Sequence, residues 1–175
     1  MIVYMKTALM SFVVLLGLFT NAFAADLLSV GTEAPDFTLP SSTGEQVALS
    51  SFKGKKQVVL YFYPKDNTPG CTTEAQNFRD HQAKFEKAGT VVLGVSVDDE
   101  KSHKFFSEKQ KLNFPLLADV GGKVARQYGV MGWIMAKRVT YVIGTEGKIK
   151  HVFSDVDVEG HAKDVLRVVS EPIKN

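Results

Sequence analysis

Apolar positions along the chain switch between two spacings, one typical of strands and one typical of helices. Runs rich in β-branched and aromatic residues, bounded by glycine, proline and polar clusters, predict strands. The longest of them, 57–63, is continuously apolar, which is typical of a central strand covered on both faces. The predicted strands, in chain order, are 36–39, 46–49, 57–63, 90–97, 114–118, 139–143 and 148–153.

Helical spacing, with apolar residues three and four positions apart, appears between these strands. It is clearest at Ala75, Phe78 and Phe85, which predict a helix over 71–88 that Gly89 ends. The loop before it, 64–70, holds two prolines and a glycine, and we expect it to form neither strand nor helix. The other predicted helices are 100–111 with Phe105 and Phe106 packed inward, 121–128, and a last one with Ala162, Val165, Leu166 and Val169 on one face.

The order of these elements predicts the fold class. Strand, helix, strand, helix and strand, followed by an antiparallel hairpin and a closing helix, indicate an α/β fold with a mixed central sheet and helices on both faces. The βαβ part should be parallel and right-handed. This order resembles that of the thioredoxin-like fold. No repeat, low-complexity tract or polar linker divides residues 25–175, so we interpret them as one domain.

Residues 1–24 differ in composition from the rest of the chain. Lys6 supplies a positive charge, residues 8–19 form a 12-residue apolar run, and Ala22 and Ala24 make a small-residue cleavage site. This arrangement is typical of a secretory signal peptide, whereas a membrane span needs about 20 apolar residues. We therefore expect an exported protein, periplasmic or secreted, without stable membrane association after cleavage. The alternative is an uncleaved N-terminal anchor.

Composition excludes several classes of function. The 21 basic and 19 acidic residues give a net charge of +2, which predicts no general affinity for nucleic acid. The single cysteine excludes an intrachain disulfide, a Cys-x-x-Cys redox pair and a cysteine-based zinc site. The four histidines have no metal-motif spacing, and no phosphate loop or dinucleotide fingerprint is present. We expect no cofactor and no metal.

The lone cysteine, Cys71, stands between the proline-rich loop and the first long predicted helix. Ligand sites of open α/β sheets lie beyond the carboxyl ends of the strands, which is where this junction falls. A helix start presents free N–H groups and partial positive charge, which favour a thiolate over a thiol. The alternative is an inert, buried cysteine, since free cysteine is among the most buried residue types.

Three segments resemble the peroxiredoxins, and within them the peroxiredoxin Q or bacterioferritin comigratory protein group. Residues 61–75, with Phe78-Arg-Asp80, resemble the family's active-site segment, and its Pro-x-x-x-Thr-x-x-Cys spacing is met by Pro64, Thr68 and Cys71. Residues 137–153 resemble the segment that carries the active-site arginine, here Arg138. Residues 31–39 resemble the opening hairpin.

The resemblance implies a thiol-dependent peroxidase for hydrogen peroxide and organic hydroperoxides. Cys71 would attack the peroxide as a thiolate and become a sulfenic acid. Thr68 would turn its hydroxyl toward the sulfur and the peroxide, and Arg138 would serve both with its fork of donors. Pro64 would shield the intermediate from water. Glu74 is interpreted as complementing the helix dipole and is left out of the catalytic set.

One departure from the family pattern decides how the enzyme is recycled. Most relatives in this group that resolve their own sulfenic acid place a second cysteine five residues after the first, where this chain has Gln76. The resemblance therefore implies a one-cysteine peroxiredoxin that needs an external thiol: a thioredoxin-like protein, glutaredoxin or a small thiol. We expect a monomer or weak homodimer, and a Cys71–Cys71 disulfide between two copies stays open. The alternative function is a non-catalytic thioredoxin-like binding or chaperone module.

Overall fold

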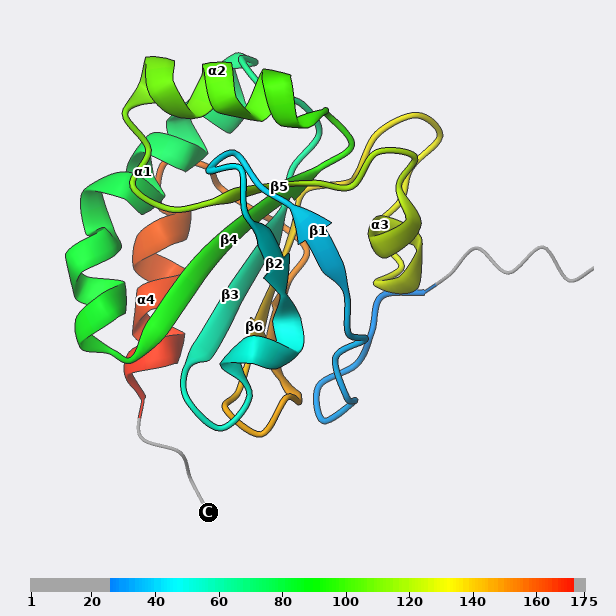
Figure 1. Ribbon diagram of the computed structural model, residues 1–175. Coiled ribbons are helices and arrows are strands. Elements are labelled where there is room, and N and C mark those ends of the chain that lie inside the picture. Colours follow the sequence, from blue (N-terminus) through cyan, green and yellow to red (C-terminus); the bar gives the residue numbers. More distant parts are fainter. Residues whose placement is uncertain (1–25, 172–175) are drawn as a thin grey trace, which may run out of the picture.

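The computed structural model describes residues 26–171 (Figure 1). The predicted signal peptide, residues 1–24, lies outside the described residues. Within the described part of the chain, no helix has the length and apolar character needed to cross a bilayer.

A mixed five-stranded sheet forms the centre of the described residues. Its strands are β3 (Gln57–Phe62), β4 (Thr90–Ser96), β5 (Leu116–Ala118), β6 (Val139–Ile143) and β7 (Ile149–Phe153), in the spatial order β5-β4-β3-β6-β7. The β3–β4 and β4–β5 pairs are parallel, and β6 is antiparallel to both β3 and β7. The predicted parallel βαβ part, the closing hairpin and the mixed sheet are thus confirmed.

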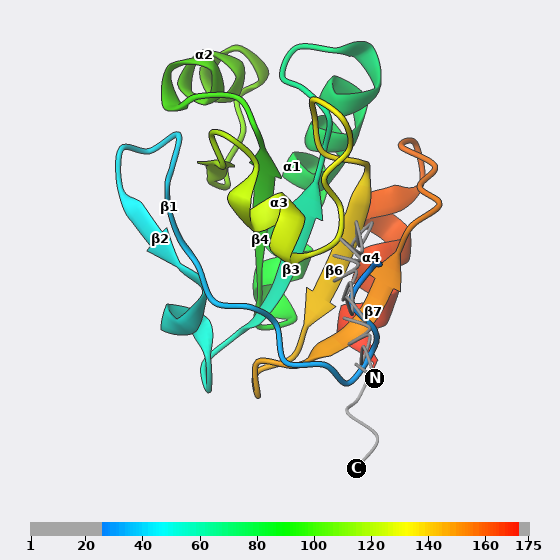
Figure 2. The ribbon, with the colours of Figure 1, turned by 90° about the vertical axis from the view of Figure 1, so that its right-hand side faces the viewer.

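The remaining elements cover the two faces of this sheet. A separate antiparallel hairpin, β1 (Thr38–Pro40) and β2 (Gln46–Ala48), is followed by a 3-10 turn at Leu49–Phe52. Figure 2 shows this hairpin beside the main sheet, and a bridge between Ser41 and Leu117 connects its segment to β5. The helices are α1 (Pro69–Lys87), α2 (Glu100–Gln110), α3 (Lys123–Gln127) and α4 (His161–Ser170), and α1 and α4 lie side by side (Figure 1).

Strand β3 separates two hydrophobic clusters because its side chains alternate between the faces of the sheet. Val58, Leu60 and Phe62 pack with side chains of the hairpin segment and α3. Val59 and Tyr61 pack with side chains of α1, α2 and α4, so helices cover both faces as predicted. The cysteine at the start of α1 belongs to this second cluster.

Two local predictions were wrong. Helix α1 begins at Pro69, two residues before the predicted start, because proline has no N–H to lose in the first turn of a helix and its fixed φ suits that turn. Phe105 is 58% exposed, with the ammonium of Lys109 5.7 Å from its ring centroid, whereas Phe106 is fully buried. Consecutive residues of a helix point in directions about 100° apart, so only one of the pair faces the core.

Candidate active site

Cys71 occupies the third position of α1, where the chain has just left the carboxyl end of β3. The loop before α1, helix α2 and the loop before β6 gather at the same end of the sheet, at the top of Figure 2. The side chain of Cys71 is only 2% exposed. The predicted position at a helix start is confirmed, and the sulfur is enclosed rather than open to solvent.

Arg138 reaches the sulfur from the neighbouring strand. It directly precedes β6, whose first residue, Val139, pairs with Phe62 at the end of β3. Its Nη2 donates a hydrogen bond to Cys71 Sγ at 3.3 Å. The guanidinium also passes close to the backbone of Gly70, where an added Cβ would lie 3.4 Å from Nη2. The structure therefore brings Cys71 and Arg138 together as the sequence predicts.

Glu74 binds the other side of the same guanidinium. It lies one turn after Cys71 on α1, is fully buried, and accepts a hydrogen bond through Oε2 from Arg138 Nη1. Burial raises the pKa of Glu74 to about 7, although the charge and hydrogen bond of Arg138 act in the opposite direction. A carboxyl group that shares the guanidinium of Arg138 with the Cys71 sulfur therefore titrates near neutral pH.

Helix α4 and strand β6 contribute further polar contacts next to Glu74. The Nε2 atom of His161 lies 2.8 Å from Thr140 Oγ1 and 3.8 Å from Glu74 Oε1. Within the described residues, Glu74 Oε1 makes no hydrogen bond. Burial lowers the pKa of His161 to about 4, so its ring is neutral at neutral pH. Arg138 is therefore the charged partner of both Glu74 and Cys71.

Thr68 and Pro64 lie in the loop before α1. Thr68 is the N-cap residue of this helix, and its Oγ1 donates a hydrogen bond to the carbonyl of Lys65 at 3.1 Å. Both Thr68 and Cys71 belong to the described residues, and no hydrogen bond between their side chains is found there. Pro64 is half-buried directly after Tyr63. Both residues lie shortly before Cys71 in the sequence. The hydroxyl of Thr68 donates its hydrogen bond within the loop, to the carbonyl of Lys65.

Sequence reasoning did not predict that Glu74 is buried, or that His161 lies next to it in the site. The spacing of Cys71 and Glu74, three residues on one helix, already places the two side chains on the same face. That signal was available. His161 is 90 positions from Cys71 in the sequence, and nothing in its surroundings there connects it to the site.

The arrangement places two sources of positive charge beside the cysteine sulfur. The start of α1 contributes the positive end of a 19-residue helix, and Arg138 contributes a permanent charge with two separate donors. A guanidinium can stabilise a negative charge on the sulfur, and it can also donate a hydrogen bond to a bound oxygen atom. Among residues 26–171, no three His, Cys, Asp or Glu side chains group as metal ligands do. Gln76, five residues after Cys71, donates a hydrogen bond through its Nε2 to Gln110 Oε1 of α2 at 2.9 Å.

The chain is similar to known proteins over most of its length. Residues 30–152 match the AhpC/TSA family. Peroxiredoxin Bcp of Escherichia coli is 43% identical over 152 residues, which are 82% of this chain and 97% of that protein. The crystal structure of peroxidoxin BcpB from Mycobacterium tuberculosis has a TM-score of 0.77 and 36% identity, and the match covers 81% of this chain and 96% of that one.

A third comparison agrees. The bacterioferritin comigratory protein of Xanthomonas campestris has a TM-score of 0.76 and 37% identity, over 81% of this chain and 97% of that one. The family resemblance and the thioredoxin-like fold expected from the sequence are confirmed, and a non-catalytic binding module is not supported. The chain belongs to the AhpC/TSA family, and within it to the Bcp and Q peroxiredoxins, which are thiol-dependent peroxidases.

Proposed function

We propose that Cys71 is the residue that attacks the peroxide, and that Arg138 stabilises the negative charge on the reacting atoms. The observation that carries this assignment is the 3.3 Å hydrogen bond from Arg138 Nη2 to Cys71 Sγ at the start of α1. The cysteine thiolate attacks one peroxide oxygen, so an S–O bond forms while the O–O bond breaks. The sulfur loses two electrons and becomes a sulfenic acid, and the departing hydroxide or alkoxide takes up a proton to leave as water or alcohol.

Thr68 and Pro64 complete the proposed peroxide site. The hydroxyl of Thr68 gives its hydrogen to Lys65 and keeps two lone pairs, with which its oxygen can accept a hydrogen bond from the peroxide. Pro64 has no N–H that could compete for the substrate. Support for Thr68 is its place as the N-cap of the helix that carries Cys71.

The proposed substrates are hydrogen peroxide and organic hydroperoxides. The comigratory protein of Xanthomonas campestris is described as having alkyl peroxide reduction activity. An alkyl group changes only the leaving oxygen, so the same sulfur and guanidinium serve both classes of peroxide.

The proposed reductant is an external thiol: a thioredoxin-like protein, glutaredoxin or a small thiol. A thiol from outside attacks the sulfenic acid, which releases water and leaves a mixed disulfide, and a second thiol restores Cys71. Because the cysteine side chain is 2% exposed, the first turn of α1 must open before a protein thiol reaches it. We further propose a monomer or weak homodimer with no nucleic-acid partner.

Arg138→Lys tests the catalytic role of the guanidinium. A lysine keeps one charge but cannot donate to Cys71 and Glu74 with two fixed donors, so we expect Cys71 oxidation by hydrogen peroxide to slow by about 100-fold. Stopped-flow oxidation without reductant measures the rate. Arg126→Lys, an exposed arginine away from the sulfur, is the control and should keep the wild-type rate. Cys71→Ser should consume no peroxide above background, and wild-type consumption by that variant would refute the proposal.

Glu74→Gln tests the buried carboxyl group through stability. The folded protein holds the Glu74 proton with a pKa of about 7, above the ordinary 4.5, so this group stabilises the fold at low pH and loses that contribution as pH rises through 7. The unfolding free energy of wild type minus variant should therefore increase by up to about 3 kcal/mol between neutral and acidic pH. His161, whose pKa is lowered, has the opposite dependence in both proteins and cancels. Urea unfolding at several pH values measures the difference, and a constant difference contradicts the assignment.

The external reductant is tested by trapping. Peroxide-treated protein is mixed with a thioredoxin whose second active-site cysteine is replaced by serine, and intact mass identifies the products. We expect a one-to-one mixed disulfide at Cys71, because the chain has no second thiol that could resolve the sulfenic acid. A homodimer joined by a Cys71–Cys71 disulfide in stoichiometric yield, with no trapped complex, contradicts an external reductant of this kind.

Export is proposed from the composition of residues 1–24. When the full chain is produced with an active secretion system, the N-terminus of the exported protein should be Ala25. Full-length protein in the membrane fraction would instead indicate the uncleaved anchor.

A further inference from the structure

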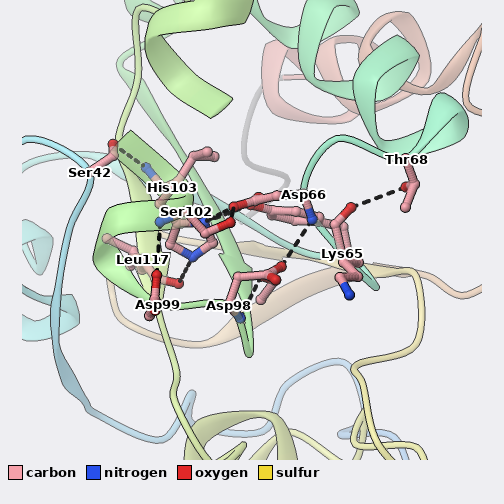
Figure 3. Close-up of polar contacts among 12 residues, drawn as sticks. Ser42, Lys65, Asp66, Thr68, Asp98, Asp99, Ser102, His103 and Leu117 are labelled. Atoms are coloured by element: carbon pink, nitrogen blue, oxygen red, sulfur yellow. Dashed lines mark hydrogen bonds and ion pairs between the residues drawn. The ribbon is translucent and has the colours of Figure 1, made fainter. Parts of the chain in front are cut away.

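A buried polar network lies behind the loop that carries Thr68, and the peroxide chemistry does not use it. We call it the loop network and define it as Tyr63, Asp66, Asp98, Ser102 and His103 (Figure 3). Its members come from the end of β3, the loop before α1, the end of β4 and helix α2. The exposed fraction is 5% or less for Asp66, Tyr63 and His103.

Asp66 is the centre of the loop network. Its Oδ1 accepts a hydrogen bond from the hydroxyl of Tyr63 at 2.7 Å. Its Oδ2 accepts one from Ser102 Oγ at 2.7 Å and lies 2.9 Å from His103 Nδ1. Its backbone N–H donates to Asp98 Oδ2 at 2.9 Å. Three separate elements therefore hold this one loop residue.

His103 connects the loop to the sheet. Its Nδ1 faces Asp66, and its Nε2 lies 3.1 Å from the carbonyl of Leu117 on β5. Both neighbours offer acceptor atoms, so each ring nitrogen of His103 lies at hydrogen-bond distance from a polar partner. Burial alone would raise the pKa of Asp66, but His103, Tyr63 and Ser102 outweigh it and lower that pKa. Asp66 and His103 therefore form a buried polar pair whose hydrogen bonds are satisfied.

The loop beside this pair has a backbone conformation that needs support. Asn67 has a φ of 58°, in the left-handed region that residues other than glycine seldom occupy. Such residues persist where the surrounding structure over-determines them. Asp66 is fixed by the loop network on one side, and on the other side Thr68 accepts the first helical hydrogen bond of α1 from Thr72 N at 2.9 Å. The position of Thr68 therefore depends on how Asp66 is held.

A buried pair of polar side chains is costly to desolvate, and apolar residues of similar size often stabilise a fold as well or better. Its place here, one residue before the turn that leads into α1, points to a role in positioning. We propose that Asp66 and His103 are positioning residues for the peroxide step, holding the loop before α1 so that Thr68 and the first turn of α1 keep their places around Cys71. This inference rests on the proposed roles of Cys71 and Thr68.

The two half-reactions place opposite demands on this loop. The peroxide step needs the loop and the first turn of α1 in their closed positions. The thiol step needs the same turn to open, because Cys71 is enclosed. Loosening the loop should therefore slow the first step and leave the second unchanged or faster. A pair that only stabilised the fold would not separate the two steps.

The test compares Asp66→Asn, His103→Ala and His103→Gln with Asp119→Asn as the matched control. Asp119 is also a buried carboxylate, and both of its carboxylate oxygens accept hydrogen bonds from the start of α3, from the N–H groups of Val124 and Ala125, rather than from the loop network. The peroxide step is measured by stopped-flow oxidation with hydrogen peroxide. The thiol step is measured by reduction of the pre-oxidised protein with dithiothreitol. Unfolding free energies are measured in urea.

We expect His103→Ala and Asp66→Asn to slow the peroxide step by about tenfold to a hundredfold, with the thiol step unchanged or faster. His103→Gln keeps a donor toward Asp66 and should retain most of the wild-type rate. If His103→Ala does not fold, His103→Gln and Asp66→Asn still test the proposal. Asp119→Asn should lose stability without a change in the peroxide step.

Three results would overturn the inference: unchanged peroxide rates, equal slowing of both steps, or the same loss with Asp119→Asn. Cys71→Ser separates this failure from failure of the proposed function. If Cys71→Ser is inactive while the loop variants behave like wild type, only the positioning role is wrong. If Cys71→Ser still consumes peroxide, the proposed function itself fails.

Discussion

The guanidinium of Arg138 lies between the sulfur of Cys71 and the buried carboxyl group of Glu74, and it donates a hydrogen bond to each. One permanent charge thus serves two groups on the same face of α1. Arg138 directly precedes strand β6. This strand pairs with β3, whose end leads into the loop before α1. The mixed sheet is therefore what brings a residue from the second half of the chain to the helix start.

Burial gives this contact its strength and also limits access. In a partly dry site the attraction between a guanidinium and a sulfur anion is far larger than it would be in water. The same enclosure leaves the cysteine 2% exposed, so a small peroxide and a protein thiol face different barriers. With one cysteine in the whole chain, no intrachain disulfide can form, and the proposed cycle therefore takes its reductant from outside.

Local sequence patterns predicted most of the fold and the position of Cys71 at the start of a helix. The apolar run of β3 and the helical spacing after Cys71 are local patterns, and both appear in the structure close to where they were predicted. Arg138 was found through its family resemblance, because a charged residue before a strand has no distinctive local signal. The start of α1 at Pro69 was missed because proline is compatible with the first turn of a helix as well as with a loop.

The rest depended on tertiary contacts that local patterns do not encode. The raised pKa of Glu74 comes from burial beneath neighbouring elements, and the helix position alone is compatible with an exposed residue. The pairing of Asp66 with His103 joins residues 37 positions apart through the folding of α2 against the loop. Phe105 and Phe106 are equally apolar, and only the rotation of α2 decides which one is buried.

The central claim is that Cys71 is the residue that peroxide oxidises, and that the hydrogen bond from Arg138 to its sulfur stabilises the charge that forms in this step. The most direct measurement is the intact mass of the protein after treatment with hydrogen peroxide in the presence of dimedone, which traps a sulfenic acid, with Cys71→Ser as the control. The account predicts one dimedone adduct at Cys71, which forms more slowly in Arg138→Lys, and none in Cys71→Ser. A wild-type protein that consumes peroxide without forming this adduct would contradict it.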